Sequence, residues 1–277
     1  MTLHHVVVGV DGSLVACRAL DLAADEAVRH GAELRVVYAV PDSDEAGPVL
    51  ASAITRVGAR HPGLPVVTRA PVGGVVRALA HESEGAELTV VGTRDLGPVA
   101  GRLFGSVSLR LAAHAHSPLL VVRGDHPCDD GRAVLLGLED DSDAAAAAYA
   151  FREAERRGTP LRVLHAWTHR HVGPELPSLV PASSPGQERL ARRDRAENAV
   201  PRFGMARLRE RHPGVEVESR TVRTAPAHAL LEATRESAVV VVGAPRRPHR
   251  LGPRLGPVAH TLLRRSHCPV VLLPIAE

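Results

Sequence analysis

The sequence repeats itself, and this repetition constrains the fold more than any other feature. Segments of the first half recur in the same order in the second: 6–13 as 134–141, 34–40 as 161–167, 60–63 as 211–214, and 117–122 as 268–273. The tetrapeptide at 60–63, Arg-His-Pro-Gly, recurs without change. Because chance does not produce so many matches in one order, the chain is a tandem duplication. Both halves are therefore expected to share one fold.

Short, continuous apolar segments alternate with longer helical patterns in each half. In the first half, strands are predicted near 4–10, 34–40, 65–69, 87–92 and 118–122, and helices near 14–30, 47–60, 73–84 and 105–115. Apolar runs without polar alternation are typical of parallel strands that are covered on both faces. Right-handed crossovers then produce an open, doubly wound sheet. We expect an α/β fold of two tandem five-stranded parallel sheets with helices on both faces.

Length and turn-forming residues predict two domains joined by a linker. A chain of 277 residues suits two domains better than one. The polar, turn-rich stretch after residue 124 predicts a first domain over 1–124, a linker over 125–131 and a second domain over 132–277. Prolines between 167 and 186 predict an irregular loop, and residues 187–211 read as a long charged helix.

Composition excludes several classes of function. None of the 34 basic residues is lysine, so the chain has neither a P-loop lysine nor a Schiff-base lysine. A net charge of +3 does not indicate a nucleic-acid partner. No apolar run is long enough to span a bilayer, and the first strand follows the N-terminus too closely for a signal peptide. We therefore expect no membrane partner. The three cysteines lack CxxC spacing, which favours a reducing compartment and predicts a cytoplasmic protein.

A glycine-containing segment in the first half has the pattern of an anion site. An apolar strand ends at Gly92, a loop follows, and Gly105-Ser106 opens a helix. Backbone N–H groups at a helix N-terminus bind anions, and glycine permits close approach of the backbone. Ser106 and Ser108 add hydroxyl donors. In the second half Gly243 leads at the same spacing to Gly256, but Pro257 follows and lacks both an N–H and a hydroxyl.

With these features the chain resembles the universal stress protein (UspA-like) family in its tandem two-domain form. The family signature Gly-x2-Gly-x9-Gly-(Ser/Thr) is matched by Gly92, Gly105 and Ser106, while Asp95 replaces the second glycine. The turn at 10–13 after the first strand matches as well, and the resemblance covers essentially the whole chain. It implies the Rossmann-like fold of the adenine-nucleotide alpha-hydrolases. It also implies ATP across the carboxyl ends of strands one, two and four, with its phosphates at the signature loop.

The resemblance assigns nucleotide binding residue by residue. The implied positions are Gly9, Val10, Asp11, Ala39, Val91, Gly92, Asp95, Gly105, Ser106, Val107 and Ser108. Asp11 would accept a ribose hydroxyl or help to hold Mg2+, although an N-terminal helix cap is an alternative role. Asp95 places a carboxylate near the phosphates, and the repulsion costs affinity unless a cation bridges them. The expected ligand is therefore ATP, with or without Mg2+.

The second half departs further from the signature. Glu139 replaces the aspartate, Arg246 the second glycine and Pro257 the serine. We expect this half to bind ATP poorly or not at all and to support the first half. Four arginines crowd its loop and could supply positive charge for an anion: Arg246, Arg247, Arg250 and Arg254. No metal site is assigned, because the paired histidines lack partnered ligands: His4 with His5, His114 with His116, and His169 with His171.

Three functions remain open from the residues. The favoured hypothesis is a regulatory stress-response module that binds an adenine nucleotide without turnover. An enzyme with weak ATP hydrolase or adenylyl-transfer activity is the alternative, with Asp11 and Asp95 as the candidate bases. A structural protein with empty sites is the third. The final strands, 119–122 and 270–273, are expected to pair within the chain as an intrachain pseudo-dimer, and association of two chains as a homodimer is left open.

Overall fold

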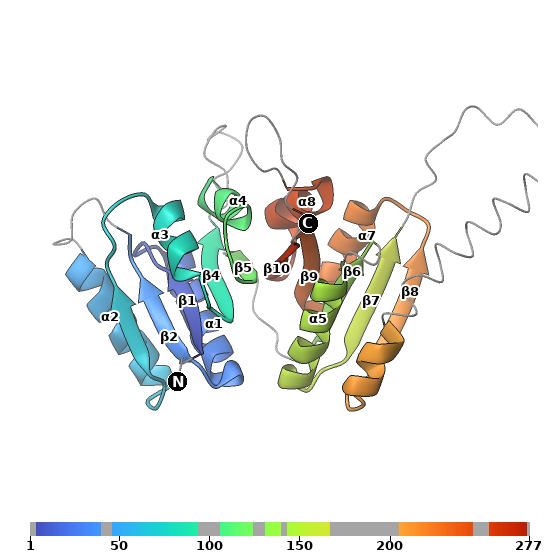
Figure 1. Cartoon of the computed structure of the whole chain (residues 1–277), viewed down its shortest axis with the longest axis horizontal. Helices are drawn as coiled ribbons and strands as arrows, with labels where there is room; N and C mark the ends of the chain where they lie inside the picture. Colours follow the sequence, from blue (N-terminus) through green and yellow to red (C-terminus); the bar gives the residue numbers. More distant parts are fainter. Residues whose placement is uncertain are drawn as a thin grey trace, which may run out of the picture.

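The computed structural model describes residues 4–39, 46–93, 106–123, 131–139, 143–166, 205–245 and 255–275. The first half contains strands β1 (His5–Gly9), β2 (Glu33–Val37), β3 (Val66–Arg69), β4 (Leu88–Thr93) and β5 (Leu119–Arg123), with helices α1 (Leu14–His30), α2 (Ala46–Arg60), α3 (Val75–Glu82) and α4 (Ser106–Ala112). These are the predicted elements, with their ends shifted by a few residues (Figure 1).

The second half repeats this order. Its strands are β6 (Ala133–Leu138), β7 (Leu161–Ala166), β8 (Val217–Val222), β9 (Ser237–Pro245) and β10 (Val270–Ile275), and its helices are α5 (Ala144–Arg157), α7 (Pro226–Ala233), the short η3 (Thr234–Glu236) and α8 (Pro257–Arg265). Of the helix predicted over 187–211, residues 205–211 are helical and the rest lie outside the described residues. The predicted irregular loop and all but one residue of the predicted linker also lie outside them.

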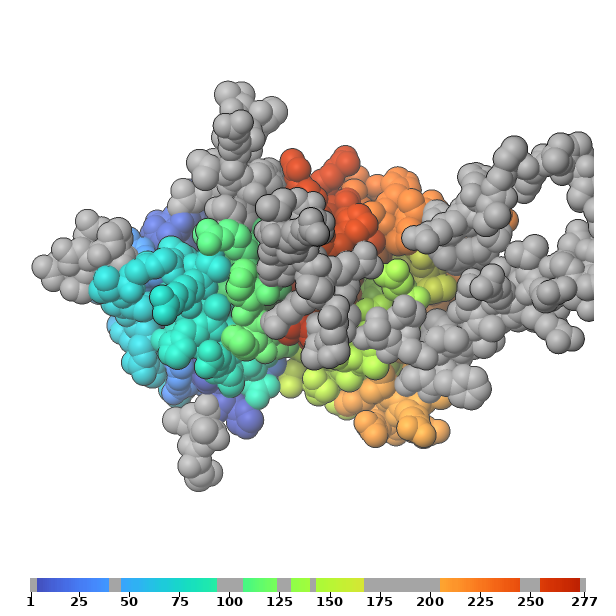
Figure 2. All heavy atoms as spheres, turned by 45° about the horizontal axis from the view of Figure 1, so that its top comes forward, coloured from blue at the N-terminus to red at the C-terminus, as the bar shows by residue number. Residues whose placement is uncertain are grey.

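The strands form one continuous sheet in the order β3-β2-β1-β4-β5-β10-β9-β6-β7-β8. Pairing within each half is parallel, as predicted. The halves meet where β5 and β10 pair antiparallel, with Leu120 opposite Val271. This confirms the expected intrachain pairing of the two final strands, and it joins the two five-stranded sheets into one of ten. Figure 2 shows the blue-to-green first half beside the yellow-green-to-red second half.

Helix α1 illustrates why these segments fold as predicted. Ser13 caps its N-terminus, because the Ser13 hydroxyl accepts a hydrogen bond from the N–H of Ala16 at 3.2 Å. Gly31 ends it in the left-handed conformation at φ 60°, and Gly158 ends α5 at φ 62°. The buried face of α1 is mostly alanine, which lets the helix lie close to the sheet and explains how a chain with 2% aromatic residues builds a core.

The core has two layers, one on each face of the sheet. One layer packs α1 and α5 against the strands and includes Leu20, Leu136 and Phe151. The other packs α4 and α8 and includes Leu111 and Leu262. Each layer contains residues of both halves, so the hydrophobic core continues across the β5–β10 pair. No helix among the described residues has the length and apolar character that a bilayer span requires.

Candidate functional site

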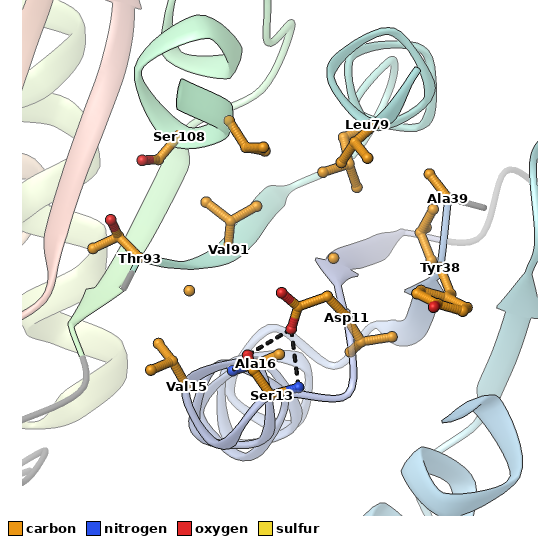
Figure 3. Close-up of a pocket in the computed structure, with 16 residues that line it drawn as sticks. Asp11, Ser13, Val15, Ala16, Tyr38, Ala39, Leu79, Val91, Thr93 and Ser108 are labelled. Atoms are coloured by element: carbon orange, nitrogen blue, oxygen red, sulfur yellow. Dashed lines mark hydrogen bonds between the residues drawn. The ribbon is translucent and has the colours of Figure 1, made fainter. Parts of the chain in front are cut away.

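A cavity of about 310 Å³ lies at the carboxyl ends of β1, β2 and β4 (Figure 3). From β1 the chain crosses to β2 on one side and the sheet continues to β4 on the other, so the cavity lies at the point where the strand order reverses. Open parallel sheets bind ligands at this position, because loops diverge there and leave a crevice. The volume falls at the lower end of the range of small-molecule sites.

Most of the sequence-predicted residues that the structure describes line this cavity. They come from the ends of β1, β2 and β4 and from the first turn of α4, and they are Gly9, Val10, Asp11, Ala39, Val91, Gly92, Val107 and Ser108. Ser106 is the first residue of α4, while Asp95 and Gly105 lie outside the described residues. The roles of all these residues in binding remain predictions.

The sequence reasoning missed the other half of the cavity wall. The missed residues are Ser13, Val15, Ala16, Val37, Tyr38, Val75, Leu79 and Thr93. Val75 and Leu79 lie one turn apart on α3, and this apolar spacing was a signal that could have identified them. Val15 and Ala16 belong to the first turn of α1, which directly follows the recognised turn at 10–13. Part of the missed wall is therefore adjacent in sequence to a motif, whereas α3 comes from elsewhere in the chain.

Asp11 lies at the cavity without capping the helix itself. Its Oδ1 accepts hydrogen bonds from the Ser13 N–H at 3.0 Å and from the Ser13 hydroxyl at 2.5 Å (Figure 3). The cap of α1 is Ser13, whose hydroxyl binds the N–H of Ala16. Two roles were considered for Asp11, ligand binding and capping of α1, and Ser13 fills the capping role. Gly12, at φ +75°, permits the tight turn that carries Asp11 to the cavity.

Two glycines in the wall make room for helices. A Cβ on Gly92 would lie 2.8 Å from Cγ1 and 3.0 Å from the carbonyl oxygen of Val15, so α1 fills the space next to this glycine. A Cβ on Gly9 would lie 3.0 Å from Leu79 Cδ1, so α3 fills the space there. Gly92 was expected to let the backbone approach a phosphate. The structure gives it a packing role, which does not depend on any ligand.

The described lining is largely apolar with a few polar groups. Asp11 is its one formally charged side chain, and hydroxyls come from Ser13, Tyr38, Thr93 and Ser108. Thr93 and Ser108 are almost fully buried; Thr93 ends β4 and Ser108 belongs to α4 (Figure 3). Apolar walls with a small number of placed polar atoms are typical of sites that bind a small organic molecule.

The matching region of the second half has different residues at the helix start and after the first strand. Pro257 begins α8, preceded by Gly256, which provides no side-chain cap. Proline suits the first position of a helix, because the backbone N–H of that position has no partner within the helix. Without this N–H, however, the helix start has one donor fewer for an anion. After β6, the Glu139 N–H donates to Asp143 Oδ2 at 2.6 Å. The four arginines of the loop lie outside the described residues.

Comparison with known proteins agrees with this architecture. The chain matches the Universal stress protein family over residues 2–123 and again over 132–274. A universal stress protein of Mycolicibacterium smegmatis is 32% identical over 98% of this chain and 97% of its own length. The crystal structure of a universal stress protein from Archaeoglobus fulgidus covers 100% of both chains at 18% identity, with a TM-score of 0.70.

A further universal stress protein, crystallised in complex with cAMP, is 32% identical and covers 45% of this chain, with a TM-score of 0.40. That protein aligns over its full length.

Together, the double match across nearly all of the chain and the duplicated α/β fold lead to one conclusion. This chain belongs to the universal stress protein family, in its tandem two-domain form.

Proposed function

We propose that this chain is a regulatory protein that binds ATP, or another adenine nucleotide, in the cavity of its first half. One observation carries the proposal: the described residues that the family resemblance assigns to nucleotide binding lie at the ends of β1, β2 and β4 and in α4, and all but Ser106 line a single cavity. The apolar walls suit the flat face of an adenine ring, and the few polar groups suit ribose and phosphate oxygens.

Individual residues have distinct roles in this proposal. Asp11 accepts a ribose hydroxyl or helps to hold Mg2+, because a carboxylate is a suitable ligand for both. The Ser108 hydroxyl and the loop that ends at Gly105-Ser106 donate to phosphate oxygens. Asp95 repels those oxygens, so Mg2+ is expected to strengthen ATP binding by bridging the two. Replacing Asp95 by the family's glycine then removes most of the need for the metal ion.

Isothermal titration with ATP tests whether the cavity is the binding site. Ala39→Phe places a ring at the cavity wall and is expected to weaken binding at least tenfold. Ala59→Phe adds the same ring on the exposed face of α2 and is the matched control, with wild-type affinity expected. Equal ATP affinity in both variants would show that the nucleotide binds elsewhere.

The signature loop needs its own variants. Gly105→Val and Ser106→Ala are expected to weaken ATP binding, since they remove backbone freedom and a hydroxyl donor. Asp95→Gly is expected to strengthen it, and more so without Mg2+ than with it. Wild-type behaviour of all three variants would reject the assignment of this loop to the phosphates.

Binding without turnover is the favoured activity. Among the described lining residues, Asp11 alone has a carboxylate that could act as a base, and its Oδ1 already accepts two hydrogen bonds from Ser13. The sequence also contains no lysine to neutralise a leaving phosphate. Incubation with labelled ATP is expected to yield no sustained phosphate release. Multiple turnovers that disappear in Asp11→Ala or Asp95→Ala would instead establish the enzymatic alternative.

The second half is proposed to support the first rather than to bind ATP. Pro257 at the start of α8 lacks the donors that Ser106 would supply. A titration is therefore expected to give one ATP per chain. Chromatography of small molecules released by heat distinguishes this from a purely structural protein, which would release no nucleotide. Light scattering at micromolar concentration tests whether two chains associate. The cytoplasm is the proposed compartment, on the cysteine pattern.

A further inference from the structure

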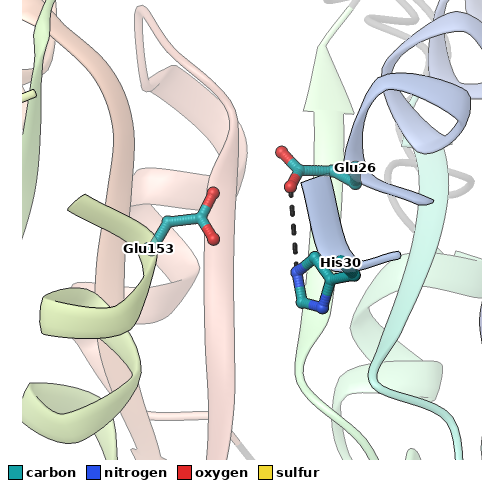
Figure 4. A group of neighbouring side chains, drawn as sticks. All are labelled: Glu26, His30 and Glu153. Carbon is teal, nitrogen blue, oxygen red and sulfur yellow. Dashed lines mark ion pairs between the residues drawn. The ribbon is translucent and has the colours of Figure 1, made fainter. Parts of the chain in front are cut away.

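A buried cluster of titratable side chains lies where the two halves meet, apart from the cavity. Helix α1 contributes Glu26 and His30, and helix α5 contributes Glu153, whose carboxylate points toward Glu26 (Figure 4). The three side chains are 1%, 2% and 2% exposed. One ligand atom from each lies within 4.8 Å of the other two. The repeat matches Glu26 with Glu153 as equivalent positions but does not indicate that the two side chains meet.

Arg157 occupies one oxygen of each carboxylate. Its Nε donates to Glu153 Oε1 at 2.5 Å, and its Nη2 donates to Glu26 Oε1. Arg29 Nη2 adds a hydrogen bond to the same Glu26 oxygen at 2.9 Å. The first oxygen of each carboxylate is therefore held by a guanidinium, and the second oxygens face the rest of the cluster.

The remaining atoms of the cluster are poorly paired. Glu153 Oε2 is buried and has no hydrogen-bond partner. Glu26 Oε2 accepts a long hydrogen bond from Arg29 Nε at 3.4 Å and lies 4.0 Å from His30 Nε2. Arg156 Nη1 lies 3.4 Å from His30 Nε2 and 3.9 Å from Glu153 Oε2, both longer than a good hydrogen bond. Arg156 is also the most exposed cation of the cluster, at 27%.

The protonation states of His30 and Glu26 suit a cation. Burial and the neighbouring Arg156 guanidinium lower the pKa of His30 to about 4, so its imidazole is neutral at neutral pH, as a metal ligand must be. Burial by itself raises the pKa of Glu26, but Arg157 and Arg29 reverse this and keep that carboxylate ionised. Burial and the charge of Glu26 raise the pKa of Glu153. A cation between the two carboxylates would relieve that repulsion.

We propose that Glu26, His30 and Glu153 form a divalent metal site between the two halves, in which Zn2+ takes the place of the Arg156 guanidinium. The ligand atoms are the second carboxylate oxygens and His30 Nε2, with water as a fourth ligand. Tetrahedral Zn2+ separates its ligand atoms by roughly 3.4 Å, and His30 Nε2 now lies 4.0 Å from Glu26 Oε2, so small side-chain movements must bring the ligand atoms together. Arg157 keeps its hydrogen bonds to the first oxygens and orients both carboxylates.

Charge and donor type define which metal the site takes. Exchange of Arg156 for Zn2+ raises the local charge by one, while Arg157 and Arg29 remain nearby and repel the ion. We therefore expect micromolar affinity rather than the tighter binding of structural zinc sites. A mixed set of imidazole and carboxylate ligands favours Zn2+ over Mg2+, because Mg2+ prefers oxygen ligands alone and keeps its waters.

Calorimetric titration of the full chain with Zn2+, after treatment with EDTA and its removal, tests the site. Glu153→Gln is expected to weaken Zn2+ binding more than tenfold. Arg156→Gln removes the competing cation and is expected to strengthen binding several-fold. His114→Gln changes an exposed histidine outside the cluster and is the matched control, with unchanged affinity expected. Mg2+ at the same concentrations is expected to give no heat from this site.

Two results would overturn the proposal. Equal Zn2+ affinity in wild type and Glu153→Gln would mean that surface histidines bind the ion, and failure of Arg156→Gln to strengthen binding would mean that the guanidinium does not occupy the site. If Glu153→Gln does not fold, as far-ultraviolet circular dichroism would show, crystals of Arg156→Gln soaked in Zn2+ decide. An anomalous-scattering peak between Glu26 and Glu153 is expected there, and its absence would reject the site.

Discussion

Replacement of Gly92 by alanine tests whether this glycine is required by packing or only by a ligand. The added Cβ would lie 2.8 Å from Val15 Cγ1 and 3.0 Å from the Val15 carbonyl oxygen. Rotation of the Val15 side chain relieves the first contact, but the second involves backbone, so the start of α1 must move away from β4. Residues in α1 pack across a large part of the first core layer, which makes such a shift costly.

Overpacking of this kind costs about 1–3 kcal/mol of unfolding free energy. Urea denaturation, followed by circular dichroism without any nucleotide present, measures this change in unfolding free energy. In a thermal melt, the melting temperature is expected to fall by about 3–10 °C. Gly58→Ala is the matched control. It lies on the exposed face of α2 with no atom within 4 Å of its Cβ, so alanine there is expected to stabilise by about 0.4–1 kcal/mol.

The opposite result is informative. If Gly92→Ala unfolds at the same urea concentration as wild type, or stabilises as Gly58→Ala does, then α1 does not occupy the space beside Gly92. The packing role would be rejected, and the glycine would be explained by the family's phosphate contact alone. A loss of stability together with retained ATP affinity would show that Gly92 is required by packing and not by the nucleotide.

Three further perturbations have defined outcomes. The pKa of His30 is depressed from 6.5 to about 4, so the unfolded chain takes up a proton first as the pH falls. Unfolding free energy in EDTA should drop by up to about 3 kcal/mol between pH 6.5 and 4, and urea titrations of His30→Gln should lack that part of the slope. Arg157→Met leaves two buried carboxylates facing each other and should cost about 3–5 kcal/mol, whereas Arg60→Met, which removes a half-exposed arginine, should cost less than about 1 kcal/mol in the same assay. Gly31→Ala and Gly158→Ala force alanine into the left-handed region, so each should lower the unfolding free energy by about 1 kcal/mol although neither Cβ meets another atom; thermal melts showing no loss would reject this conformational cost.

Local chemistry and repetition were sufficient to predict the elements and their order. Each helix and strand of the first half was predicted within a few residues, because buried parallel strands are continuous apolar runs and helix ends have their own signals. Gly31 and Gly158 stand at matching helix ends and both adopt the left-handed conformation. The cavity residues at the ends of β1 and β4 were predicted from the family resemblance, whose motifs are contiguous in sequence.

The sequence by itself thus determined the α/β class, the duplication and the edge of the sheet at which the cavity lies, because these depend on neighbours along the chain. Only the tertiary structure decided which distant residues meet. It placed Val15 against Gly92, completed the cavity with Val75 and Leu79 of α3, and brought Glu153 to Glu26 and His30. Such contacts depend on how helices settle on a sheet that β5 and β10 join antiparallel, and no periodicity within either half encodes that arrangement.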